Sequence, residues 1–158
     1  MKALVAYFSA SGQTAKLVRT IADVTGGDLF EIAPVTAYTA ADLNWMDKKS
    51  RSTIEMKDPK SCPAIAGKVA DMAQYDTVFV CFPIWWYQAP RIIETFLESY
   101  DFSGKTVIPF ATSGGSGMGG EDILKAACSK ETKWLKGKRL SSRESAASVQ
   151  KWVESLSI

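Results

Sequence analysis

The sequence predicts an α/β fold, a doubly wound parallel sheet of five strands with helices on both faces, and a single domain over residues 1–158. Strand-length apolar runs alternate five times with amphipathic, helix-length runs, which is typical of a parallel sheet. Two of the middle runs are apolar on both faces, as strands covered by helices on each side are. A chain of 158 residues suits one sizeable core, and right-handed crossovers then favour the doubly wound topology.

The expected strands are the apolar runs. Pro109 lies inside the fourth of them, and a central strand needs the N–H group that proline lacks. We therefore expect a bulge or a local break there, near the end of the strand. The runs are Ala3–Phe8, Asp28–Ile32, Thr77–Phe82, Thr106–Ala111 and Lys133–Leu140.

The expected helices lie between these strands and carry recognisable ends. Gly26 and Gly27 end the first helix, Pro90 suits the first turn of the third, and Glu121 and Asp122 suit the positive end of the fourth. The last helix is expected to begin at about Ser142, with Glu144 as its candidate capping partner. The expected ranges are Thr14–Val24, about 65–74, Pro90–Ser99, Glu121–Ser129 and about 142–156.

Residues 34–64 form a long polar connection between the second strand and the second expected helix. Asp42–Met46 is a candidate for one helical turn. Loops of this length are often functional. Trp45 could cover a site, but a hydrophobic anchor is the interpretation we favour.

The chain contains no histidine, which excludes Ser-His-Asp hydrolysis, Cys-His proteolysis and histidine-ligated metal chemistry. Catalysis would need a cofactor, carboxylates, Lys or Tyr. The three cysteines, Cys62, Cys81 and Cys128, are scattered and lack metal-ligand spacing, so we expect no metal and no disulfide framework. We expect a reducing, cytoplasmic compartment.

The net charge of +2 is unevenly distributed. Residues 1–129 carry 12 basic and 14 acidic side chains, whereas residues 130–158 carry 7 and 3. The basic C-terminal part lacks an aromatic stacking pattern, so we interpret it as a solvated face and expect no nucleic-acid partner. The apolar runs are too short to span a bilayer, and the first one is expected to be a strand rather than a targeting segment, so we expect no membrane partner.

The first of three unusual loops has the sequence Ser9-Ala10-Ser11-Gly12-Gln13-Thr14, between a strand and a helix. Hydroxyls and free N–H groups at a helix N-terminus suit a phosphate. The loop lacks the lysine of a P-loop and the glycines of a dinucleotide fingerprint. Neutral donors favour a phosphate monoester that is held permanently rather than cleaved.

The second loop, residues 83–90, contains the consecutive aromatic residues Trp85, Trp86 and Tyr87. They follow a buried strand and cannot all point inward. Aromatic faces favour a bound planar ring, but a protein–protein patch stays open as an alternative.

The third loop, residues 112–120, contains five glycines in nine residues. Glycine permits close backbone approach and positive φ. A flexible linker would share this composition, but the position after a buried strand favours one wall of a ligand site. All three loops follow strands, so they should meet at one edge of the sheet, where such folds bind ligands.

Together the three loops resemble the flavodoxin family along the whole chain. The likeness is strongest to bacterial members with Pro-Ile-Trp-Trp, here 83–86, and Thr-Ser-Gly-Gly-Ser-Gly, here 112–117, and it extends over Ala89–Glu98. The length agrees with the short-chain form. The resemblance implies a flavodoxin-like sheet with strand order 2-1-3-4-5.

The resemblance also implies FMN as the cofactor. It places the phosphate at the first loop, the flavin ring at the second and the O2/N3 edge of the ring at the third. The implied binding residues are Ser9, Ala10, Ser11, Gly12, Gln13, Thr14, Pro83, Ile84, Trp85, Trp86, Thr112, Ser113, Gly114, Gly115 and Gly117.

The function implied first is a low-potential electron carrier, a monomer that exchanges electrons with a reductase and an acceptor protein. The alternative is an FMN-dependent NAD(P)H:quinone-type oxidoreductase, because the nearly balanced charge departs from the strong acidity of many flavodoxins. A flavin-free signalling module is a third candidate. Such a module would need acidic residues after the first and third strands, where this chain has serines and Pro83 instead.

Overall fold

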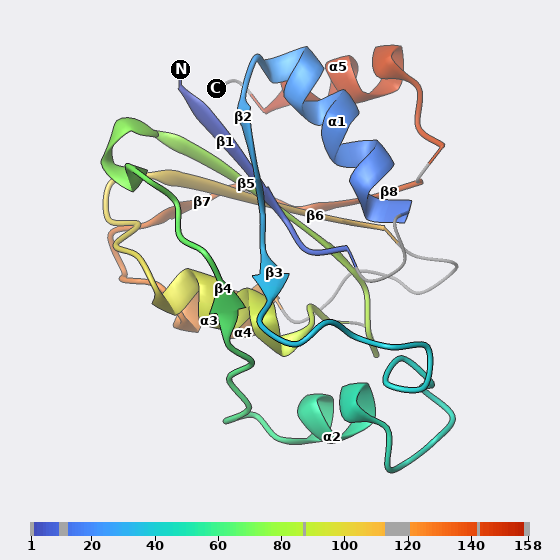
Figure 1. The fold of residues 1–158 in the computed structure, drawn as a ribbon. Helices are drawn as coiled ribbons and strands as arrows, with labels where there is room; N and C mark the ends of the chain where they lie inside the picture. Colours follow the sequence, from blue (N-terminus) through green and yellow to red (C-terminus); the bar gives the residue numbers. More distant parts are fainter. Residues whose placement is uncertain (1, 10–12, 87, 113–120, 142, 157–158) are drawn as a thin grey trace.

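The computed structural model describes residues 2–9, 13–86, 88–112, 121–141 and 143–156. They form a mostly parallel sheet with helices on both faces (Figure 1). The strand order is β2-β1-β5-β6, with β7 and β8 both on the outer side of β6. The predicted order is therefore confirmed, with the fifth position divided in two. The strands are β1 Ala3–Tyr7, β2 Asp28–Glu31, β5 Thr77–Pro83, β6 Thr106–Thr112, β7 Lys133–Trp134 and β8 Lys138–Leu140.

Helices α1 and α5 cover one face of the sheet, and α3 and α4 cover the other (Figure 1). All four lie where the sequence predicts helices, although α4 and α5 are shorter than expected. Pro90 occupies the N-cap position of α3, one residue before the first turn in which the sequence places it. The helices of the described residues are α1 Gln13–Thr25, α2 Arg51–Lys57, α3 Arg91–Glu98, α4 Glu121–Ala126 and α5 Ala146–Ser155.

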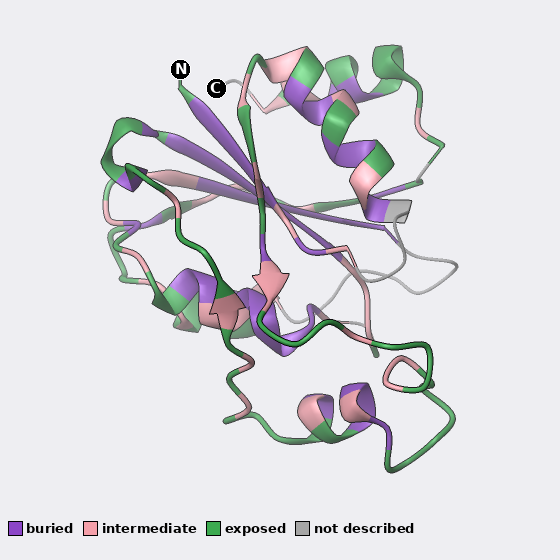
Figure 2. Ribbon diagram, in the orientation of Figure 1, coloured by how far each residue is buried: buried purple, intermediate pink, exposed green. Residues whose placement is uncertain are grey.

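The central strands are buried on both faces (Figure 2). Along β5, Phe79 and Cys81 pack toward α1 and α5, whereas Val78 and Val80 pack toward α3 and α4. Successive side chains of a strand point to opposite faces, so each face needs its own apolar set. This explains why the middle runs of the sequence are continuously apolar.

The helix predicted over about 65–74 is wrong. Ile65–Ala66 forms β4, which pairs antiparallel with β3, Ala33–Pro34. Gly67 follows with φ of 82°, a left-handed conformation that stops a helix. A single 3₁₀ turn, η1, then covers Met72–Gln74.

Pro109 lies within β6, and the register of β6 with β5 runs through it without a break. The irregularity is instead in the neighbouring strand, between β7 and β8. On the side of the outer strand, the carbonyl of Val107 accepts from the N–H of Leu135, with 3.1 Å between oxygen and nitrogen. Pro109, two residues further, has its nitrogen on the same side. The missing donor therefore faces the gap in the outer strand.

Residues 35–64, called the excursion below, leave the sheet edge and return to it. The N–H of Val35 donates to the carbonyl of Ala64 at 3.0 Å and closes the segment. Its helix α2 lies away from the sheet (Figure 1) and is capped by Ser50, whose hydroxyl accepts from the N–H of Thr53. One helical turn, from Thr39 to Leu43, lies slightly before the predicted turn.

Candidate functional site

The carboxyl ends of β1, β5 and β6 bring the three unusual loops to one edge of the sheet. The N–H of Phe8 donates to the carbonyl of Cys81 at 2.9 Å, which joins the end of β1 to β5. The N–H of Ile84 donates to the carbonyl of Thr112 at 3.0 Å, which joins the second loop to the third. The strand ends that the three loops follow therefore meet at one edge of the sheet, as predicted.

Part of the predicted site lies outside the described residues. For the first and third loops, the structure gives the flanking residues Ser9, Gln13, Thr14 and Thr112. The predicted residues that lie outside the described parts are Ala10, Ser11, Gly12, Ser113, Gly114, Gly115 and Gly117.

The first and third loops are joined by two buried hydroxyl groups. The Oγ1 atoms of Thr14 and Thr112 lie 2.8 Å apart. Each hydroxyl has one proton, so one of the two donates to the other. The accepting hydroxyl then keeps its own proton for another acceptor. This pair therefore offers one neutral donor at the point where the two loops meet.

The N-terminus of α1 also faces this edge. The helix begins at Gln13, directly after the first loop, and Ser9 directly follows Phe8 at the end of β1. Its first turn contains no acidic residue. The partial positive charge at the start of a 13-residue helix is therefore not neutralised by its own sequence.

The second loop separates its tryptophans. The N–H of Trp85 donates to the carbonyl of Gln88 at 2.9 Å, and the N–H of Gln88 donates back at 3.1 Å, which closes a tight turn. Trp86 stands in this turn with φ of 49°, a left-handed conformation that is uncommon outside glycine. Its side chain is 40% exposed, whereas Trp85 is half-buried. The turn thus presents one indole to solvent and one to the protein.

Trp85 packs edge-on against two other aromatic rings. Its ring centroid lies 5.7 Å from that of Phe8 and 5.5 Å from that of Tyr38, with interplanar angles of 86° and 75°. These are favourable geometries for aromatic pairs. Pro83 ends β5, and Ile84 packs against the core beside Trp85. The second loop is therefore fixed to the end of β1 and to the excursion.

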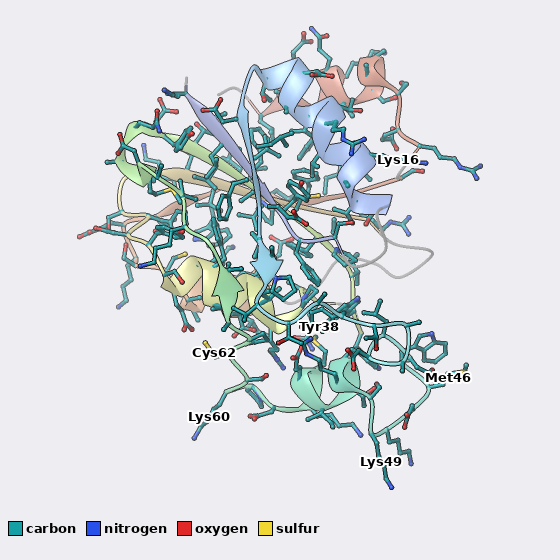
Figure 3. The ribbon with its side chains drawn as sticks, viewed as in Figure 1. Lys16, Tyr38, Met46, Lys49, Lys60 and Cys62 are labelled. Atoms are coloured by element: carbon teal, nitrogen blue, oxygen red, sulfur yellow. The ribbon has the colours of Figure 1, made fainter. Side chains whose placement is uncertain are left out.

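Tyr38 is held by polar contacts as well. Its hydroxyl donates to Oε1 of Glu55, and the guanidinium of Arg51 lies 3.8 Å above its ring. Arg51 and Glu55 form an ion pair at 3.0 Å. Burial, together with the hydrogen bond to Glu55, raises the pKa of Tyr38 above its ordinary range. Tyr38 lies between α2 and the body of the domain (Figure 3).

Arg91 holds the end of α2 against the start of α3. Its side chain is buried, and it donates to the carbonyls of Met56 at 2.7 Å and Glu55 at 3.3 Å. It also pairs with Glu94 at 2.9 Å. Met56 lies in the last turn of α2, where carbonyls lack intrahelical partners. The carbonyl of Glu55 also accepts from the N–H of Asp58 at 3.2 Å.

The contacts of Tyr38, Glu55, Arg51 and Arg91 were not predicted from the sequence. One signal was present: Arg91 begins a helix whose next two residues, Ile92 and Ile93, are buried. A charged residue on such an apolar face usually has partners. The sequence did not indicate that those partners belong to the excursion.

An open pocket of about 230 Å³ lies between α2 and the turn of the second loop. One helix face supplies Thr53, Met56 and Lys57, at spacings of three and four residues. The facing wall consists of Trp86 and Gln88.

Trp45 does not anchor the excursion. Its side chain is 68% exposed, and that of the neighbouring Met46 is 73% exposed. The expectation of a hydrophobic anchor is therefore wrong. Met46 and Lys49 lie at the outer margin of the excursion (Figure 3).

The described residues contain no group of three side chains that could ligate a metal, and none of their helices is long and apolar enough to cross a bilayer.

Comparisons with known proteins agree with this architecture. The family model described as Flavodoxin matches residues 2–156. A candidate flavoprotein from Bacteroides eggerthii is 46% identical, with a TM-score of 0.93 and coverage of 99% of this chain and 98% of that one. A second, from Bacteroides uniformis, is 48% identical, with a TM-score of 0.90 and coverage of 97% of each chain.

A more distant relative in structure was solved with a ligand. A flavoprotein from Lactobacillus acidophilus, solved in complex with FMN, is 20% identical, with a TM-score of 0.71 and coverage of 99% of each chain. No curated protein is significantly similar to this chain.

Proposed function

Because this chain belongs to the flavodoxin family, we propose that it binds FMN and acts as a low-potential electron-transfer protein. One observation carries the proposal. The hydroxyls of Thr14 and Thr112, the start of α1 and the indole of Trp85 are brought to the same edge of the sheet. Hydrogen-bond donors can bind the phosphate of a flavin mononucleotide, and an aromatic side chain can pack against its ring.

The described residues fit FMN. The start of α1 and the hydroxyl pair of Thr14 and Thr112 offer uncharged donors for a phosphate. Trp86 offers an exposed aromatic face for a planar ring. The FMN held by the Lactobacillus flavoprotein supports the same cofactor here. When bound, FMN supplies one- and two-electron chemistry that the side chains lack.

The protein's own contribution is binding, orientation and polarity. Ile84 and Trp85 surround the site with apolar surface, and such surroundings raise the free energy of added negative charge. This favours a low reduction potential. The phosphate donors carry no full positive charge, so only the partial charge at the start of α1 offsets the charge of the phosphate.

The partners we propose are a reductase and an acceptor protein, and we propose that the chain acts as a monomer in the cytoplasm. The three cysteines are free, which suits a reducing compartment. Trp86 is exposed beside the proposed ring position and is available for docking.

The alternative is an FMN-dependent NAD(P)H:quinone-type oxidoreductase. The pocket between α2 and Trp86 favours it, because a small acceptor could bind next to the second loop. The net charge of +2 also departs from the acidic surface that steers flavodoxins to basic partners.

The test begins with the visible spectrum of the purified protein and identification of the released chromophore. Apoprotein is then titrated with FMN while flavin fluorescence is followed. We expect a yellow protein and saturable, stoichiometric binding, weakened by Trp85→Ala. A colourless protein that gains no absorbance with FMN contradicts the proposal.

Stopped-flow mixing of the loaded protein with NADPH separates the two functions. Bleaching that needs a partner protein supports the carrier. Rapid bleaching by NADPH alone supports the oxidoreductase.

A further inference from the structure

Tyr38 of the excursion contacts Phe8, the residue just before the first loop, and Trp85 of the second loop. Its ring lies 5.6 Å from Phe8, at an angle of 64°, and 5.5 Å from Trp85, at 75°. Phe8 and Trp85 also contact each other, at 5.7 Å. We call Phe8, Tyr38 and Trp85 the aromatic triangle. Each ring has its edges or face against the other two, so a rotation of one requires movement of the others.

The polar end of Tyr38 is fixed independently of the triangle. Its hydroxyl donates to Glu55, while Arg51 stacks on the ring at 3.8 Å and pairs with the same carboxylate. Arg51 is itself held by the carbonyl of Thr36, to which its Nη1 donates at 2.7 Å. The orientation of the Tyr38 ring is therefore set within the excursion.

The excursion is fixed in turn to the body of the domain. Buried Arg91 at the start of α3 donates to the carbonyls of Glu55 and Met56. A side chain that is fixed at its polar end and packed at its ring can hold a neighbour in one rotamer. The neighbour is Trp85, the half-buried indole of the second loop.

We infer that Tyr38 is a positioning residue for the FMN site, which sets the orientation of Trp85 and through it the affinity for FMN and its reduction potential. The inference rests on the proposed function. It assigns to the excursion a role in tuning the cofactor, beyond covering one side of the domain.

The competing explanation is that Tyr38 only fastens the excursion and contributes stability. Tyr75 provides a matched control. Tyr75 is buried, whereas Tyr38 is half-buried, and both hydroxyls donate to a carboxylate, that of Tyr75 to Asp28 at 2.7 Å. Tyr75 precedes β5, at the opposite edge of the sheet from the site. The same substitutions therefore remove an aromatic ring or a hydroxyl near the proposed cofactor, at Tyr38, and far from it, at Tyr75.

The experiment compares Tyr38→Leu, Tyr38→Phe, Tyr75→Leu and Tyr75→Phe with the wild-type chain. The Kd for FMN, the midpoint potential of the bound flavin and the near-ultraviolet circular dichroism of the apoprotein are measured. We expect Tyr38→Leu to weaken FMN binding roughly tenfold, the loss expected from two aromatic contacts. The midpoint potential should rise, because water entering beside Trp85 stabilises added negative charge.

Tyr38→Phe keeps the ring, so its Kd should stay within about threefold of wild type. Both Tyr75 variants should keep the wild-type Kd and potential even where they unfold more easily. The tryptophan bands in the circular dichroism of the apoprotein should change in Tyr38→Leu. In a Trp85→Phe background, the same substitution should leave the tryptophan bands unchanged. Such non-additivity shows that Tyr38 acts through Trp85.

Two outcomes overturn the inference. In one, Tyr38→Leu keeps the affinity, the potential and the dichroism of wild type. In the other, Tyr75→Leu changes them to the same extent, which makes the role of Tyr38 structural. If the wild-type chain binds no FMN, the proposed function itself is contradicted. If the wild-type chain binds FMN and Tyr38→Leu binds it equally well and at the same potential, only the inference is contradicted.

Discussion

Two neighbouring tryptophans of the second loop occupy different environments. The sequence predicts that three consecutive aromatic residues cannot all be buried, and Trp86 is indeed exposed. It does not predict which of the two indoles packs inward. That choice depends on Tyr38, which is distant in the sequence and meets Trp85 only through the path of the excursion.

The hydroxyl pair of Thr14 and Thr112 leads to a prediction about coupling. Thr14→Val or Thr112→Val should each lower the free energy of unfolding by about 1–2 kcal/mol, because each leaves a buried hydroxyl without its partner. The double variant should lose less than the sum of the single losses. Urea unfolding of the four proteins measures the coupling, and strictly additive losses would contradict it.

Tyr75 leads to a prediction about alkaline stability. Burial, and then its hydrogen bond to Asp28, raises the pKa of Tyr75 to about 12 from its ordinary value of 10.0. The native state keeps this proton at a pH where the unfolded state has lost it. The contribution is therefore complete below pH 10 and is lost as the pH rises toward 12.

The measurement is the urea midpoint at several values between about pH 8 and pH 11.5. Tyr75→Phe should show a shallower loss above pH 10 than wild type, since it has no phenol to titrate. Parallel curves for the two proteins would show that Tyr75 does not contribute.

At the scale of elements, the sequence predicts β1, β5, β6, α1 and α3 closely because local pattern and tertiary environment agree there. It fails over 65–74 for an identifiable reason. Ile65, Val69 and Met72 have helical spacing and do pack on the core. The left-handed Gly67 and the pairing of β3 with β4 nevertheless prevent a helix.

Helix α2 was missed because it is short and mostly polar. A helix of seven residues has little stability of its own and depends on tertiary contacts. Those contacts are made by Tyr38 and Arg91. A local sequence pattern does not contain this information.

Arg91 therefore leads to a prediction about the excursion. Arg91→Lys keeps a charge beside Glu94 but replaces a fork of donors that reaches two carbonyls with a single ammonium. We expect the free energy of unfolding to fall by about 1–3 kcal/mol, and trypsin to cleave faster after Lys48 and Lys49. Timed proteolysis with mass spectrometry follows the second effect.

Arg19→Lys is the control for that experiment, because Arg19 is exposed on α1. It should leave both the stability and the cleavage pattern unchanged. Equal cleavage of the excursion in Arg91→Lys and wild type would show that Arg91 does not fasten α2.

At the scale of the whole molecule, the convergence of the three loops could be predicted, because the carboxyl ends of parallel strands share one edge. The docking of the excursion onto that edge could not. Its path depends on many weak, long-range contacts, among them those of Tyr38 and Arg91. The sequence thus predicted that the three strand ends meet, but not the segment that packs beside them.

The balanced charge leads to a prediction about docking. With a net charge of +2, the chain lacks the strong opposite charge that steers association with a basic reductase. The rate of reduction by a basic ferredoxin-type reductase should change little between about 0.02 and 0.2 M salt. A strongly acidic flavodoxin, measured with the same reductase, should show a steep fall, and a similarly steep fall for this chain would contradict the prediction.

The divided fifth strand has a consequence for behaviour at high concentration. An open sheet edge with a long row of unpaired amides invites pairing with another molecule and, in the end, fibril formation. Here the outermost strand is split into β7 and β8, and the exposed side chains of Lys133, Lys138 and Arg139 lie along them. The break in the outer strand beside Pro109 therefore shortens the row of unpaired amides at this edge and should reduce edge-to-edge aggregation.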